Sequence, residues 1–210
     1  MKVMTINQVR MAVLVGAAGA LLASVTGCRV EDHKDGDATN VKIATPFGGM
    51  SVKTNDKVIQ GNMGLDVYPG AVLERKKNEN DSAADINMSF GSFHLGVKAV
   101  SYTTPDSTDQ VMAFYQKDLS KHGSVIKCKD DRPVGMPVRT DDGLTCDDDD
   151  KKNTVQVNAK DGKGTVELKF GSKQHQHIVS IEPHDGGTKI GLVALDLPGN
   201  FSVTDEDNKQ

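Results

Sequence analysis

Residues 85–99 read DINMSFGSFHLGVKA, two stretches of alternating apolar and polar side chains on either side of the dipeptide Gly91-Ser92. Alternation with a period of two is typical of strands that bury one face. A two-residue break that begins with glycine favours a type II′ turn, which needs a positive φ at its first central residue. This stretch therefore predicts a β-hairpin, and the rest of the fold can be placed around it.

The segment that follows this hairpin predicts a helix over residues 106–122. Ser107 and Gln110 stand at the spacing of a capping box, in which each side chain bonds the backbone of the other. Apolar side chains recur on one face, at Val111, Phe114, Tyr115 and Leu119. Gly123 suits the left-handed position that ends a helix. We expect this face to lie on a sheet.

Further strands are predicted on both sides of the central hairpin and helix. Residues 41–44 and 51–53 flank a turn and predict a small hairpin, which leaves open whether 41–54 join the main sheet. Towards the end of the chain, residues 155–157, 166–170, 179–181 and 190–195 predict an antiparallel meander. The expected fold is α+β, a meander-rich antiparallel sheet of six to eight strands with one main helix packed on one face.

The first 28 residues indicate where the protein is located. Lys2 and Arg10 precede an uncharged apolar run, and Val25-Thr26-Gly27 then leads to Cys28. This pattern resembles the lipobox of signal-peptidase II substrates, which implies cleavage before Cys28 and a diacylglycerol on its sulfur. A transmembrane helix needs about 20 apolar residues, more than this run offers. Ordinary cleavage after small residues is the other alternative, and a cysteine at the end of the box argues against it.

These observations divide the chain into four parts. Residues 1–27 are a signal peptide, 28–40 a flexible tether, 41–197 a single domain and 198–210 a polar tail. Arg29, rather than aspartate, follows the cysteine, which in families of such lipoproteins implies transfer to the outer membrane. We expect a lipid-anchored protein of the cell envelope, on the periplasmic face of the outer membrane.

Composition restricts the class of partner. The whole chain carries a net charge of −4, and removal of residues 1–27 takes away two basic residues and no acidic ones, which leaves −6. Nucleic acid selects for a basic surface, so nucleic acid is not expected as a partner. The chain has no Trp and few Tyr and Phe, which leaves little for an aromatic binding platform. Membrane contact should come through the N-terminal lipid.

Two cysteines remain once Cys28 is acylated. Cys128 and Cys146 in an exported chain most simply form a disulfide, which would close a loop of about 17 residues and contribute roughly 3 kcal/mol. A reactive pair or a pair of metal ligands are the alternatives. The sequence contains no Cys-x-x-Cys motif, so a thioredoxin-like role gains no support.

The turn and the helix together resemble a known group of proteins. Tyr68-Pro69-Gly70-Ala71 precedes Asp106-Ser107, and the helix then carries Val111, Phe114 and Tyr115 before Gly123. This arrangement resembles uncharacterised bacterial exported lipoproteins in which a YPGA turn is followed by a D-S-x-x-x-V-x-x-F-Y helix. The resemblance covers roughly residues 64–196 and implies a shared fold. The matched positions are turn and core residues, so it implies no catalytic residue.

His175 and His177 are the strongest candidates for chemistry. Residues i and i+2 of a strand point to one face, so both imidazoles could reach one zinc or copper ion, with His184 or His94 as a third ligand. The chain has no HExxH motif, and a strand end with two exposed histidines is a common surface feature. We commit to no metal site and expect no cofactor.

An acidic segment, 141–150, is a second candidate. Its aspartates include Asp147 and Asp149, whose hard oxygens suit Ca²⁺, although the ligand order of an EF-hand is missing. The alternative is a solvated acidic loop.

No serine-hydrolase elbow, Walker A or dinucleotide motif occurs. The favoured function is a lipid-anchored, non-enzymatic binding or structural module for an envelope protein or a small ligand. The alternatives are an envelope metalloprotein or metal-dependent hydrolase using His175 and His177, and a calcium-responsive module using 141–150.

Overall fold

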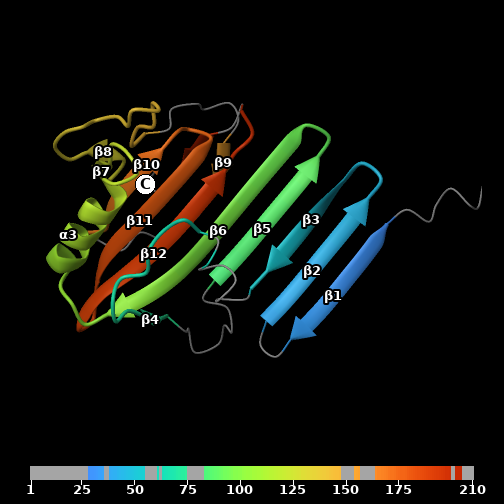
Figure 1. The fold of residues 1–210 in the computed structure, drawn as a ribbon, viewed down its shortest axis with the longest axis horizontal. Coiled ribbons are helices and arrows are strands. Elements are labelled where there is room, and N and C mark those ends of the chain that lie inside the picture. Colours follow the sequence, from blue (N-terminus) through green and yellow to red (C-terminus); the bar gives the residue numbers. More distant parts are fainter. Residues whose placement is uncertain are drawn as a thin grey trace, which may run out of the picture.

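The computed structural model describes residues 28–35, 38–54, 61, 63–74, 83–147, 154–156, 164–199 and 202–204. These residues form mostly antiparallel β-sheet with one helix (Figure 1). The elements are β1 (Arg29–Asp35), β2 (Ala38–Thr45), β3 (Gly48–Lys53), β4 (Val72–Leu73), β5 (Ala83–Phe90), β6 (Phe93–Thr104), α3 (Thr108–Leu119), β7 (Ile126–Lys129), β8 (Arg132–Pro133), β9 (Thr154–Gln156), β10 (Val166–Gly171), β11 (His175–His184), β12 (Gly187–Asp196) and β13 (Ser202–Thr204). Strands dominate more than the expected α+β class implies.

Eleven of these strands form one sheet, ordered β1-β2-β3-β5-β6-β12-β11-β10-β7-β8, with β4 beside the end of β6. This is more than the six to eight strands expected. The hairpin β5–β6 is confirmed: Phe90 pairs with Phe93, and Gly91 has a φ of +58° in the turn between them. The other side of β6 pairs with β12, so strands from distant parts of the sequence meet at the centre of the sheet.

Helix α3 is confirmed, with a shorter span than predicted. Ser107 is the N-cap, and the capping box with Gln110 is present in both directions. The helix ends at Leu119, with Ser120 as its C-cap, so the prediction that Gly123 ends the helix was wrong. The main-chain amide of Ser120 bonds the carbonyl of Gln116, and these local bonds close the last turn without a glycine. The helix packs on β10, β11 and β12.

The predicted meander holds for β10, β11 and β12, which pair in sequence order. Strand β9 departs from it, because it pairs in parallel with β13 in a separate two-stranded sheet. Residues 202–204 were expected to belong to an unpaired tail, and the structure pairs them instead. The periodicity of a segment as short as three residues does not specify its partner.

The N-terminal strands also differ from expectation. Residues 28–40 were expected to be a flexible tether, yet Arg29–Asp35 forms β1 and Ala38 begins β2. Charged side chains are typical of an edge strand, where they discourage pairing with other chains. Because they interrupt the alternation of apolar and polar residues, the sequence did not predict this strand. The hairpin β2–β3 is confirmed, and β3 pairs with β5, so this hairpin belongs to the main sheet.

The largest apolar cluster lies between α3 and the sheet. Val111, Tyr115 and Leu119 of the helix are fully buried against side chains of β10, β11 and β12. A second cluster joins Ile126 and Leu144 to the two cysteines at the β7 edge. No helix among the described residues is long and apolar enough to cross a bilayer.

Candidate functional site

A cavity of about 500 Å³ opens beyond the end of α3, at the rim of the main core. Four chain segments line it: the residues after α3, the loop that follows β8, the end of β10 and the start of β11. The lining side chains that carry its chemistry are His122, Ser124, Thr140, Asp141, Asp142, Phe170, Ser172, His175 and His177. The wall therefore combines three imidazoles, hydroxyl groups and two carboxylates with one aromatic ring.

The rings of His122, Phe170 and His177 form a stack. The centroids of Phe170 and His177 are 4.6 Å apart at an interplanar angle of 12°, because the two residues are direct partners in the β10–β11 register. His122 stacks on the same Phe170 ring at 5.7 Å and 22°. The end of the helix is thus held against the two strands by side chains of the cavity itself.

His177 is half-buried and is the less exposed of the two imidazoles in the stack. Its Nδ1 is buried and has no hydrogen-bond partner within the described part of the chain. Burial lowers the pKa of His177, and a hydrogen bond to the backbone of Met63 opposes this only in part. Gly64 has a φ of +71°, and a Cβ there would lie 3.3 Å from His177 Nε2. Glycine therefore lets this backbone approach the ring closely.

We expect the melting temperature to fall as the pH is lowered from 7 to 5.5, and to fall less in His177→Phe. The folded pKa of His177 lies below the ordinary 6.5, so the unfolded chain takes up this proton first. The stability is therefore fully present above the unfolded pKa and is lost as the pH falls through the folded pKa. Phenylalanine keeps a ring on Phe170 but cannot titrate. Thermal unfolding followed by circular dichroism at each pH measures the melting temperature of both proteins.

His94→Gln is the matched control for that experiment, because His94 is exposed and does not line the cavity. This variant should retain the pH dependence of the wild type. If His177→Phe showed the same pH dependence as the wild type, the imidazole of His177 would not be its source.

His175 lies on the same wall in a different setting. It is largely exposed, and its Nδ1 lies 2.8 Å from Oδ1 of Asp196, its direct partner on β12. The sequence thus correctly placed His175 and His177 on one face. Their ring nitrogens nevertheless bond different groups, and the structure does not direct them to a common point.

The loop that forms the opposite wall is fixed by hydrogen bonds. The Thr140 hydroxyl donates to the carbonyl of Gly171 at 2.6 Å and accepts from the amide of Leu144 at 2.9 Å. The amide of Asp141 donates to Ser124 Oγ at 2.6 Å, and the amide of Ser124 donates back to Asp141 Oδ2 at 3.3 Å. Buried Thr140 therefore ties the loop to β10, and the cavity has a defined wall.

The remaining predicted residues are dispersed. His184 lies at the other end of β11, beside a smaller cavity of about 310 Å³, and His94 lines neither of these two cavities. Asp147 is exposed, and Asp149 lies outside the described residues. Within the described ranges, no group of three or more His, Cys, Asp and Glu side chains is placed to hold a metal ion.

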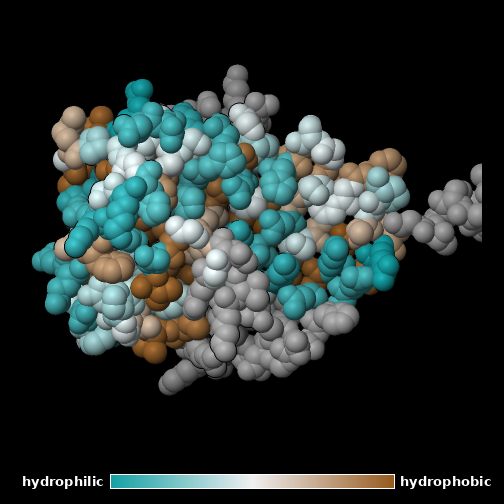
Figure 2. All heavy atoms as spheres, in the orientation of Figure 1, coloured by the Kyte–Doolittle hydropathy of each residue, from teal (hydrophilic) through white to brown (hydrophobic). Residues whose placement is uncertain are grey.

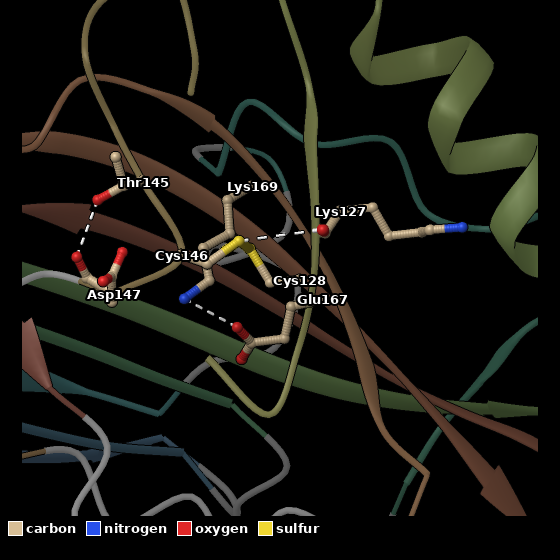
Figure 3. Close-up of polar contacts among 7 residues, drawn as sticks. All are labelled: Lys127, Cys128, Thr145, Cys146, Asp147, Glu167 and Lys169. Atoms are coloured by element: carbon tan, nitrogen blue, oxygen red, sulfur yellow. Dashed lines mark hydrogen bonds and ion pairs between the residues drawn. A yellow bond between two sulfur atoms is a disulfide. The ribbon is translucent and has the colours of Figure 1, made fainter. Parts of the chain in front are cut away.

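Cys128 and Cys146 lie at disulfide distance, with their Cα atoms 5.6 Å apart (Figure 3). The disulfide links β7 to the loop after β8, which forms one wall of the cavity. Beside it, Lys169 Nζ and Glu167 Oε2 form an ion pair at 2.8 Å, in which the lysine is buried and the glutamate half-buried. Cys28 is exposed and unpaired.

Sequence reasoning missed two central residues of the cavity. His122 is the last residue of the predicted helix 106–122 and Phe170 the last of the predicted strand 166–170, and neither was identified as a site residue. No local pattern connects them, because the helix end and β10 meet only through tertiary packing. No protein-family model, curated protein or solved structure matches this chain.

Proposed function

We propose that this protein is a lipid-anchored cell-envelope protein whose domain is a non-enzymatic binding module, with the cavity beyond α3 as its binding site. The observation that carries the binding role is the convergence of four distant segments on one cavity with a stacked aromatic wall. The leader, the exposed Cys28 and the resemblance to exported lipoproteins support the anchor, and Arg29 after the cysteine supports the outer membrane.

The cavity suits a small polar ligand or a polar side chain of an envelope protein. Its volume falls in the usual range of small-molecule sites, roughly 300–1,000 Å³. Serine and threonine hydroxyls and the carboxylates of Asp141 and Asp142 supply directional contacts, and the Phe170 ring with its two imidazoles supplies a flat surface. Burial lowers the pKa of His177, so this imidazole adds a hydrogen-bonding group rather than a positive charge to a wall that also carries two carboxylates.

An envelope metalloprotein using His175 and His177 is the alternative that one observation favours, because His122 joins them on the same cavity wall. In such a site the ring of His175 would have to turn away from Asp196, and the ring of His177 away from the Met63 backbone.

The test is intact-mass and elemental analysis of native protein extracted from membranes. We expect an acylated mass that begins at Cys28, without a stoichiometric transition metal. The Cys28→Ala variant is the control and should lack the acyl mass. An unacylated wild-type mass would overturn the anchor. A stoichiometric metal that is lost in His177→Ala would reject the non-enzymatic binding module and favour the metalloprotein.

A further inference from the structure

One face of the N-terminal half of the sheet is apolar across five strands. Residues directly opposite each other in antiparallel pairs share a face. One cross-strand row runs through Val30, Ile43, Met50, Met88 and Leu95, and the next runs through Val41, Val52, Ile86 and Val97. We call these nine residues the apolar face.

The opposite side of the same strands is polar. Its cross-strand rows contain Lys42, Ser51 and Asn87, and Asn40, Lys53, Asp85 and Lys98. Alternation along β6 sets Leu95 and Val97 on the opposite side from Val100 and Tyr102, which pack in the core under α3. Among the described strands, the helix contacts β10, β11 and β12 and none of β1, β2, β3 and β5. No described helix therefore covers the apolar face.

Exposed apolar side chains concentrate at one end of these strands. Val30 is 64% exposed and Ile43 37%, while Phe90 at the end of β5 is 45% exposed and Phe47 in the β2–β3 turn 84%. Both hairpin turns lie at the same end of the sheet (Figure 1). Apolar atoms are visible there over the β2–β3 turn (Figure 2). Large exposed apolar groups clustered in this way mark an interaction surface.

Cys28 lies at the same end and on the same side. It directly precedes β1, whose first residue, Arg29, pairs with Ala44 near the end of β2. Cys28 therefore lies beside the β2–β3 turn that contains Phe47. Extending the alternation of β1 by one residue puts Cys28 on the side of Val30, which is the side of the apolar face. No flexible spacer separates this sulfur from the sheet.

We propose that the Cys28 end of the apolar face, with Phe47 and Phe90 at its hairpin tips, lies on the bilayer surface. This inference rests on the lipid anchor of the proposed function. Acyl chains on Cys28 hold this end of the sheet at the membrane, and the apolar side chains beside it gain free energy by entering the interface. The charged edge strand RVEDHKD disfavours a second copy that would extend the sheet edge to edge.

Tryptophan substitutions test this orientation, because the chain has no Trp of its own. The acylated protein carrying Phe47→Trp is reconstituted into vesicles of phosphatidylethanolamine and brominated phosphatidylglycerol. The matched control is Met136→Trp, since Met136 is 85% exposed but lies in the loop after β8, at the other edge of the sheet. A second pair, Ile43→Trp and Lys42→Trp, compares the two faces of one strand.

We expect the brominated lipid to reduce emission roughly two-fold or more at positions 47 and 43, and to leave positions 136 and 42 unchanged. Equal quenching at 47 and 136 in protein that floats with the vesicles would overturn the orientation and leave the anchor intact. A blue shift at 47 without lipid quenching would indicate a protein partner and would also overturn it. Protein that does not float would reject the anchor, and the membrane orientation with it.

Discussion

Tyr115→Ala should lower the free energy of unfolding by about 3–5 kcal/mol, the range for truncation of a large aromatic core residue. Tyr115 is fully buried at the centre of the α3 face, with its ring 5.0 Å from that of Phe114 and 6.4 Å from that of Tyr68. Its hydroxyl accepts a hydrogen bond from the amide of Tyr68 at 3.1 Å. This bond ties the helix to the Pro69-Gly70 turn, which lies earlier in the chain. Urea unfolding followed by circular dichroism measures the change.

Tyr115→Phe separates packing from the hydrogen bond. It keeps the ring but leaves the amide of Tyr68 without its acceptor, which costs about 1–3 kcal/mol for a buried donor. Lys117→Ala, on the exposed side of the same helix, should stay within about 0.5 kcal/mol of the wild type. If Tyr115→Phe were as damaging as Tyr115→Ala, the hydrogen bond rather than packing would dominate this site.

Replacement of both Cys128 and Cys146 by alanine should lower the free energy of unfolding by about 2–5 kcal/mol, the usual effect of removing a native disulfide from a small domain. The bridge joins residues 18 apart in the sequence, and both side chains are buried with Ile126 and Leu144. Urea unfolding with and without reductant measures the effect: reductant should destabilise the wild type and leave the double variant unchanged. A wild type whose stability survives complete reduction, verified by thiol labelling, would contradict this expectation.

The same substitution bears on the proposed binding site. Thr140 and Asp141 belong to the loop that the disulfide closes, and that loop forms one wall of the cavity. Their hydrogen bonds to Gly171 and Ser124 would then hold the wall without covalent support.

Local patterns predicted the elements whose specification is local. The β5–β6 hairpin followed from strict alternation and a glycine turn, and the start of α3 followed from the capping box. The turn at Pro69-Gly70 was also recognisable: the amide of Ala71 donates to the carbonyl of Tyr68, and Gly70 has a φ of +79°. In each case one or two neighbouring residues determine the backbone.

The elements that sequence reasoning missed depend on partners far along the chain. Strand β1 exists because β2 supplies its hydrogen bonds, and its own charged sequence carries no period that favours a strand. The parallel pairing of β9 with β13 has no local signature. The cavity is a similar case: His175 and His177 were found from their spacing, whereas His122 and Phe170 join them only when the helix docks.

The pairing of β6 with β12 sets the order in which the chain can fold. The hairpins within residues 29–104 need no later part of the chain, but the second edge of β6 stays open until Gly187–Asp196 is available. Such non-local closure is slow, and an open strand edge exposed for that time is a template for aggregation. A chain truncated before β12 would keep its N-terminal hairpins while losing the strand that joins them to β10 and β11.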